Sequence, residues 1–147
     1  MFVEQRKITE QFFNHALLAG DLFCCLSPES ENSLLALKRE KQFKKNETIL
    51  ANGKKPCCVY MLLEGDVRLF SNVGAAVHRF QPNEIFGLTE AVANLPYEIS
   101  VKAVSTCRVE YIRRDDFLRF LHDNPETCFH LLEMLGANIH RISRLFR

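Results

Sequence analysis

The pattern of hydrophobic and polar positions changes twice along the chain, and the first part has helical periodicity. Residues 3–20 gather apolar side chains on one side of a helix and end at Gly20, which predicts a helix that stops there. Residues 27–37 predict a second helix, because Ser27 can cap its first turn and Pro28 suits the first helical position. The chain therefore begins, on this pattern, with two helices.

From about residue 42 to residue 112, short runs of strand-forming residues alternate with turns. Val67 and Leu69 alternate with polar neighbours, and Ile99, Val101 and Ala103 repeat the same spacing. Short strands separated by turn signals at intervals of roughly 8–12 residues are typical of a sandwich or barrel. The sequence thus predicts a mainly β domain of the α+β class, with helices on either side of a roll of strands.

The last third of the chain returns to helical spacing. A short helix is expected up to Asn124, and Pro125 then opens a longer one that runs to residue 147. Its apolar positions recur every three or four residues: Phe129, Leu132, Leu135, Ile139, Ile142 and Leu145 or Phe146. This stripe either packs on the chain's own sheet or pairs with a second copy, and we expect a homodimer because the stripe continues to the end of the chain.

Composition and charge narrow the function classes. A formal net charge of +1 excludes a strongly basic nucleic-acid binder as a description of the whole chain. No apolar run is long enough to span a membrane, and the N-terminus lacks the apolar core of a signal peptide, so a cytoplasmic protein with no membrane contact is expected. We expect one domain over residues 1–147, with N-terminal helices at 1–41, the β-roll at 42–112 and C-terminal helices at 113–147.

The cysteines predict no metal or iron–sulfur site. There is no C-x-x-C spacing, and adjacent cysteines are expected to point apart on a helix or a strand. Reduced thiols acting as small apolar side chains are the favoured interpretation, with a redox-sensing thiol at Cys24 or Cys25 as the alternative. The six cysteines are at positions 24, 25, 57, 58, 107 and 128.

Catalytic motifs are absent from the sequence. The five histidines are scattered, and none stands in a motif with a nucleophile. We therefore expect no enzyme, no catalytic residue, no metal and no cofactor. A haem sensor with His78 or Cys58 as an axial ligand is kept as an alternative.

The order of the elements and several segments resemble the cyclic-nucleotide-binding domain of the Crp/Fnr family over residues 20–147. The resemblance is carried by Gly53 in a turn, by "VYMLLEGDVRLF", by "FQPNEIFGL" with Phe86 and Gly87, and by "VKAVSTCRVEYIRRDDFLRFLHDNPE". It implies a jelly roll (a double-stranded β-helix) around a ligand pocket, followed by a long dimerisation helix. It also implies a sensor whose small-molecule effector changes how that helix packs against its dimer mate.

The resemblance also places the ligand loop, and this loop departs from the family pattern. Family members that bind cyclic nucleotides have a Glu for the ribose and an Arg for the phosphate, and here those positions hold Leu88 and Tyr97, followed by Glu98. Two like charges about 4 Å apart repel by about 4 kcal/mol at an effective dielectric near 20, so ordinary cAMP or cGMP binding is not expected. The candidate pocket residues are Phe86, Gly87, Leu88, Thr89, Glu90, Tyr97, Glu98, Ile99 and Ser100.

Two interpretations of this loop remain open. Either the pocket takes a different ligand, or Tyr97 and Leu88 fill it. The resemblance implies a regulatory sensor and dimerisation domain of a transcription regulator, with DNA contacted only through a helix-turn-helix domain that these residues do not contain. The alternatives are a true cyclic-nucleotide receptor and a redox or haem sensor.

Overall fold

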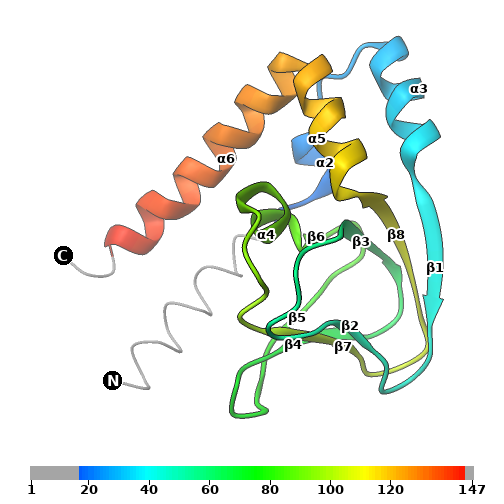
Figure 1. Ribbon diagram of the computed structural model, residues 1–147, viewed down its shortest axis with the longest axis vertical. Coiled ribbons are helices and arrows are strands. Elements are labelled where there is room, and N and C mark those ends of the chain that lie inside the picture. Colours follow the sequence, from blue (N-terminus) through cyan, green and yellow to red (C-terminus); the bar gives the residue numbers. More distant parts are fainter. Residues whose placement is uncertain (1–16, 145–147) are drawn as a thin grey trace.

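Two four-stranded antiparallel sheets form a roll, and helices gather at one end of it (Figure 1). The computed structural model describes residues 17–144, except for the side chains of residues 141–143. One sheet has the order β1-β8-β3-β6 and the other the order β2-β7-β4-β5. The strands of the first sheet are β1 (Arg39–Phe43), β8 (Cys107–Arg113), β3 (Cys58–Glu64) and β6 (Ile85–Phe86). Those of the second sheet are β2 (Thr48–Leu50), β7 (Ser100–Ala103), β4 (Val67–Phe70) and β5 (Ala76–Arg79). This arrangement confirms the predicted β-roll with flanking helices.

The alternation of apolar residues produces the core between the sheets. Val67 and Leu69 of β4 are buried while Arg68 and Phe70 between and beside them are half-buried. Val101 and Ala103 of β7 face the same interior. These two strands therefore contribute every second side chain to one shared core, as the period of two requires.

The helices cover a second apolar cluster at the end of the roll. These helices are α2 (Ala19–Leu22), α3 (Pro28–Leu37), α4 (Leu88–Ala93), α5 (Arg114–Asp123) and α6 (Pro125–Arg144). Ser27 caps α3 as predicted, because its Oγ accepts a hydrogen bond from the backbone N–H of Ser30 at 3.2 Å. Phe117 of α5 is 1% exposed and packs in this cluster with Leu34 of α3 and Leu131 of α6.

The predicted helix over residues 3–20 is wrong at its C-terminal end. Residues 3–16 lie outside the described part of the chain. Leu18 forms an isolated antiparallel bridge with Glu84, and Gly20 lies inside α2 rather than at a helix end. The reason is tertiary: the N–H of Ile85 donates to the carbonyl of Leu17 at 2.7 Å, so the backbone here pairs with the segment that leads into the ligand loop.

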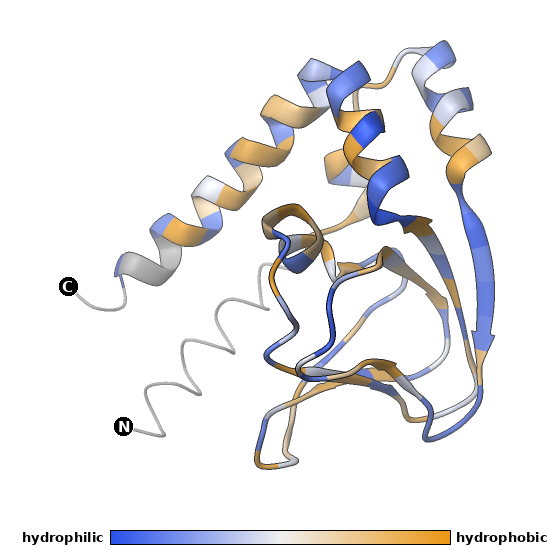
Figure 2. Cartoon of the chain, in the orientation of Figure 1, coloured by the Kyte–Doolittle hydropathy of each residue, from blue (hydrophilic) through white to orange (hydrophobic). Residues whose placement is uncertain are grey.

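The long helix α6 has two faces. Thr127, Leu131 and Asn138 are buried against the rest of the domain. Phe129, Leu132 and Ile139 are 67%, 58% and 66% exposed. Hydrophobic residues thus continue around the helix onto its outer surface, whereas β1 is hydrophilic over most of its length (Figure 2).

The predicted stripe on α6 is therefore split between these faces. Leu135 is only partly exposed and packs against the second apolar cluster of its own domain. The side chain of Ile142 and all of Leu145 lie outside the described residues. Within residues 17–144, no helix is both long and apolar enough to cross a membrane.

Candidate ligand pocket

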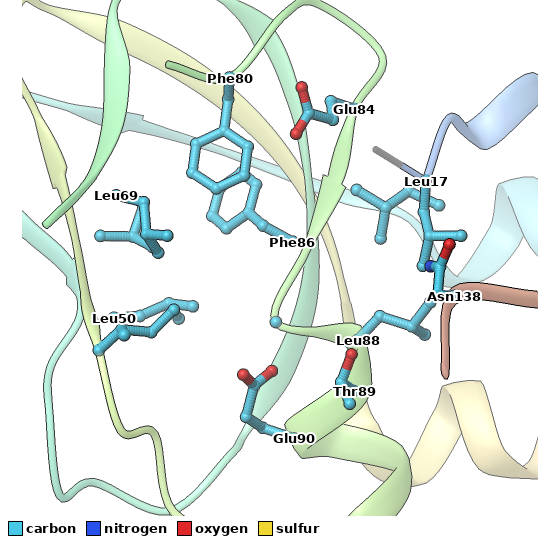
Figure 3. Close-up of a pocket in the computed structure, with 14 residues that line it drawn as sticks. Leu17, Leu50, Leu69, Phe80, Glu84, Phe86, Leu88, Thr89, Glu90 and Asn138 are labelled. Carbon is cyan, nitrogen blue, oxygen red and sulfur yellow. The ribbon is translucent and has the colours of Figure 1, made fainter. Parts of the chain in front are cut away.

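A small cavity lies where the roll meets α4 and α6 (Figure 3). Its volume is about 70 Å³. The two sheets supply an apolar wall, and the start of α4 closes the cavity. The lining residues are Leu17, Leu50, Leu69, Phe80, Glu84, Ile85, Phe86, Gly87, Leu88, Thr89, Glu90, Ile99, Val101 and Asn138.

Gly87 shapes the closing segment. It has φ of +76° and is the N-cap of α4, so the chain turns sharply from β6 into the helix. This left-handed backbone conformation favours glycine, and a Cβ at this position would be in van der Waals contact with the Cys58 carbonyl oxygen and Leu50 Cδ1, each 3.4 Å away. Leu88 follows directly and is buried at 2% exposure.

Glu84 is a buried acid with partners. Its Oε2 lies 2.7 Å from Nε2 of His78, and its Oε1 accepts a hydrogen bond from the backbone N–H of Gln81 at 3.0 Å. The carboxylate therefore closes the turn before β6, and one of the two ring nitrogens of His78 is already engaged. Glu84 serves the loop's structure as well as bordering the cavity.

Glu90 gives the cavity an acidic side. Its carboxyl is directed toward the space between Leu50 and Leu88 (Figure 3). Burial raises the pKa of this carboxyl, and the charge of Glu98 raises it further. Among the described residues that line the cavity there is no Lys or Arg. The lining of the cavity is thus acidic and apolar, whereas binding of an anion would require a positively charged side chain.

Tyr97 stands next to this site as a buried ring. It is 3% exposed, and its hydroxyl has no hydrogen-bond partner. Burial raises its pKa to about 12, with further contributions from charge on Cys57 and Glu90. Its backbone is fixed on both sides, since its N–H donates to the Lys54 carbonyl and its carbonyl accepts from Gly53. The backbone at this position is therefore held in place, and the buried ring occupies interior space.

The structure separates the nine candidate pocket residues into two groups. Phe86, Gly87, Leu88, Thr89, Glu90 and Ile99 line the cavity. Tyr97, Glu98 and Ser100 do not; Glu98 is exposed to solvent, and Ser100 Oγ accepts from the backbone N–H of Asn52 at 3.3 Å. Of the two acids in the predicted set, Glu90 lines the cavity and Glu98 does not.

Other lining residues were missed when the loop was considered alone. Leu50, Leu69 and Val101 come from strands of the second sheet, and Phe80 directly follows β5 of the same sheet. The alternation of apolar residues along these strands was the available signal. Asn138 comes from α6, more than one hundred residues from Leu17 in sequence, and no motif marks it. Ligand pockets for drug-sized molecules occupy roughly 300–1,000 Å³, so a cavity of about 70 Å³ is too small for such a ligand without rearrangement.

Comparison with known proteins connects this geometry to a family. The sequence model of the family described as the cyclic nucleotide-binding domain matches residues 40–124, which include both sheets, α4 and α5. An uncharacterized protein of Haemophilus influenzae is 25% identical over 116 residues, covering 76% of this chain and 89% of its own length.

Solved structures share the fold. The catabolite activator protein of Thermus thermophilus superposes with a TM-score of 0.74 at 22% identity, covering 84% of this chain; the chain spans 60% of the length of that protein. The sensor domain of the transcriptional regulator DNR from Pseudomonas aeruginosa superposes with a TM-score of 0.71 at 22% identity, covering 90% of this chain and 93% of that domain. At this identity the likeness concerns the fold.

Proposed function

Because the chain belongs to the cyclic nucleotide-binding domain family, we propose that it is the regulatory sensor domain of a Crp/Fnr-type transcription regulator whose pocket does not bind ordinary cAMP or cGMP. We also propose that residues 1–147 form a single domain of this kind, with no enzymatic activity and no cofactor. Any contact with DNA is placed in a domain outside these residues.

The observation that carries this proposal is the buried ring of Tyr97 beside the acid Glu90. In the resemblance to nucleotide-binding members, position 97 should supply the guanidinium that pairs with the cyclic phosphate, and Arg cannot be replaced there by an uncharged ring without loss of a bidentate pair. Here that position is 3% exposed and uncharged. An entering phosphate would meet the Glu90 carboxyl instead of a cation.

A binding measurement tests the proposal. Calorimetric titration of the full chain with cAMP and with cGMP is expected to give no binding heat, and neither nucleotide is expected to shift the thermal midpoint, because only ligands that bind the folded state stabilise it. Dissociation constants in the micromolar range or below would overturn the proposal and favour a true cyclic-nucleotide receptor.

We further propose that the outer face of α6 pairs with a second copy of the chain. Phe129, Leu132, Gly136 and Ile139 follow each other at steps of three, four and three residues, the spacing of a coiled-coil seam. The three apolar members are exposed in a single copy. Packing two such faces together would remove these side chains from water, which supports a homodimer.

Charged residues on this face are expected to give monomers. The variant Phe129→Glu/Ile139→Glu should weaken the dimer by at least about a hundredfold, while leaving the fold intact because both side chains are exposed. Analytical ultracentrifugation measures the change. Leu135 is unsuitable for this test, since it packs against its own domain.

The matched control is Leu35→Glu, which adds a charge at a 56% exposed leucine of α3. It should leave the oligomeric state unchanged. A dimer that persists in Phe129→Glu/Ile139→Glu would place the subunit interface elsewhere.

A further inference from the structure

Two neighbouring thiols meet at the turn that follows α2. Cys24 Sγ and Cys25 Sγ lie 3.3 Å apart, and both residues are exposed. The expectation that adjacent cysteines point apart is wrong here, because residues 23–25 form a turn rather than a helix or a strand. The two sulfur atoms are therefore already in contact before any bond forms between them.

A histidine from α6 completes the group. His130 Nε2 lies 2.7 Å from the backbone carbonyl oxygen of Asp21 and 4.0 Å from Cys24 Sγ. A carbonyl oxygen only accepts hydrogen bonds, so Nε2 carries the proton in this contact. Because this N–H is given to Asp21, the longer contact with Cys24 Sγ is secondary, and His130 chiefly fixes the turn that carries Cys24.

We propose that Cys24, Cys25 and His130 form a thiol-oxidation site, at which a hydroperoxide converts the two cysteines into a reversible disulfide. The inference does not depend on the ligand pocket. Cys24 borders a surface groove of about 620 Å³, so a small peroxide reaches the pair directly.

The contact between the thiols sets the order of the steps. The hydrogen bond with Cys25 raises the pKa of Cys24 and keeps this thiol protonated, so we assign the first attack to the exposed neighbouring sulfur of Cys25. The Cys25 thiolate attacks one oxygen of the hydroperoxide, the O–O bond breaks, and the products are a Cys25 sulfenic acid and hydroxide or alkoxide.

The second step closes the disulfide. The released base takes the proton of the Cys24 thiol, and the Cys24 thiolate, positioned by the turn that His130 fixes, attacks the Cys25 sulfur. The S–S bond forms as the S–O bond breaks, and the sulfenic oxygen leaves as hydroxide, which the proton lost earlier by Cys25 converts into water. With hydrogen peroxide the balance is two thiols and one peroxide to one disulfide and two waters, so the sulfurs are oxidised and the peroxide is reduced.

The resulting bond should be easily reduced. Adjacent Cα atoms are about 3.8 Å apart across a trans peptide, whereas disulfides usually join Cα atoms roughly 4.4–6.8 Å apart. A bond formed outside that range is strained, and strained, exposed disulfides have more oxidising potentials. This property suits a reversible modification rather than a structural crosslink.

The site is coupled to the two helices that hold the end of the roll. Phe23, in the same turn, packs edge-on against Phe120 of α5 with ring centroids 6.2 Å apart. His130 of α6 holds the carbonyl of Asp21 at the other end of the turn. Closing the disulfide changes the backbone between these two anchors, so oxidation is expected to loosen α2 from α6.

The second adjacent pair, Cys57 and Cys58, provides an internal comparison. Cys57 is exposed, but Cys58 is buried at 8% exposure, and burial raises its pKa to about 11. Because Cys58 is buried, its sulfur is shielded from a peroxide in solvent, whereas both thiols of the 24–25 pair are exposed. The Cys57→Ser variant is therefore the matched control for loss of an exposed cysteine.

The test exposes the full chain to hydrogen peroxide and maps the products by mass spectrometry. A disulfide, seen as a loss of two hydrogens that a dithiol reverses, is expected within the peptide holding Cys24 and Cys25, in the parent and in Cys57→Ser alike. Cys24→Ser should accumulate a sulfenic acid at Cys25 that dimedone traps, and Cys25→Ser should give about tenfold less adduct.

His130→Leu tests whether the histidine that anchors the turn promotes closure of the disulfide. It should slow disulfide closure by about tenfold and increase the dimedone adduct at Cys25, because only the second step uses the histidine. Equal dimedone labelling of all exposed cysteines, a crosslink between two chains on a non-reducing gel, or no product in the 24–25 peptide would each overturn the proposal.

Discussion

Replacing Tyr97 with Arg and Glu90 with Ala in the same chain is expected to create an affinity for cAMP that the parent lacks. The guanidinium would supply a charge-assisted pair for the phosphate, worth about 1.5–3 kcal/mol for a hydrogen bond to a charged group. Removing the carboxylate lifts a repulsion of up to about 4 kcal/mol at 4 Å and an effective dielectric near 20. Loss of the buried ring also opens space next to a cavity of about 70 Å³.

Together these changes should raise the affinity by at least about a hundredfold, since each 1.4 kcal/mol is a factor of ten. Isothermal titration calorimetry with cAMP measures the difference from the parent. Tyr97→Ala/Glu90→Ala is the matched control, because it opens the same space without adding the cation. It should give no heat of cAMP binding. Glu98→Ala should also remain silent, because Glu98 is exposed to solvent.

A different result would show that another feature prevents cAMP binding. If Tyr97→Arg/Glu90→Ala binds no better than Tyr97→Ala/Glu90→Ala, then position 97 does not reach the phosphate site. If Glu98→Ala alone restores binding, the repelling charge is Glu98 and not Glu90. Each outcome is distinguishable in the same titration.

The second large effect is expected at the turn between β3 and β4. Gly65 has φ of +106°, and a Cβ there would stand 2.5 Å from Cys107 Cβ and 2.7 Å from both Cys107 Cα and the Thr106 carbonyl oxygen. Two of these neighbours are main-chain atoms, so no side-chain rotation relieves the overlap. Gly65→Ala should therefore lower the free energy of unfolding by about 3–5 kcal/mol, combining backbone strain with overpacking.

The matched control isolates the strain from the overlap. Gly74 has φ of +82°, but nothing lies within 4 Å of a Cβ there, so Gly74→Ala should cost only about 1–2 kcal/mol. Urea unfolding monitored by circular dichroism gives both values by linear extrapolation. Equal losses for the two variants would show that the close packing against Cys107 is not what makes Gly65 necessary.

The strands could be predicted because their burial depends on local alternation. Val67 and Leu69 are buried in β4 as the period of two requires, and Ser27 caps α3 through a contact within its own first turn. The segment at Leu18 could not be predicted in the same way. Its backbone bridges to Glu84, so a distant partner overrides the helical pattern of its own sequence.

The candidate pocket likewise combines residues that local sequence predicts with residues that only the tertiary fold brings together. The loop from Phe86 to Glu90 is contiguous, and the sequence predicted these five residues together. Leu50 and Asn138 reach the cavity only through the pairing of the sheets and the path of α6. The contact between Cys24 and Cys25 escaped prediction for a related reason, since it depends on a turn that neither helical nor strand geometry describes.

Asn138 is the residue through which α6 lines the cavity. Its side chain and that of Leu88 border the same small space (Figure 3), and the next residue, Ile139, is 66% exposed on the outer surface. Successive residues on a helix are turned by about 100° from one another. A molecule bound beside Leu88 would thus contact α6 directly. A small rotation of α6 about its own axis would then change the direction of its exposed face, with no movement of the sheets.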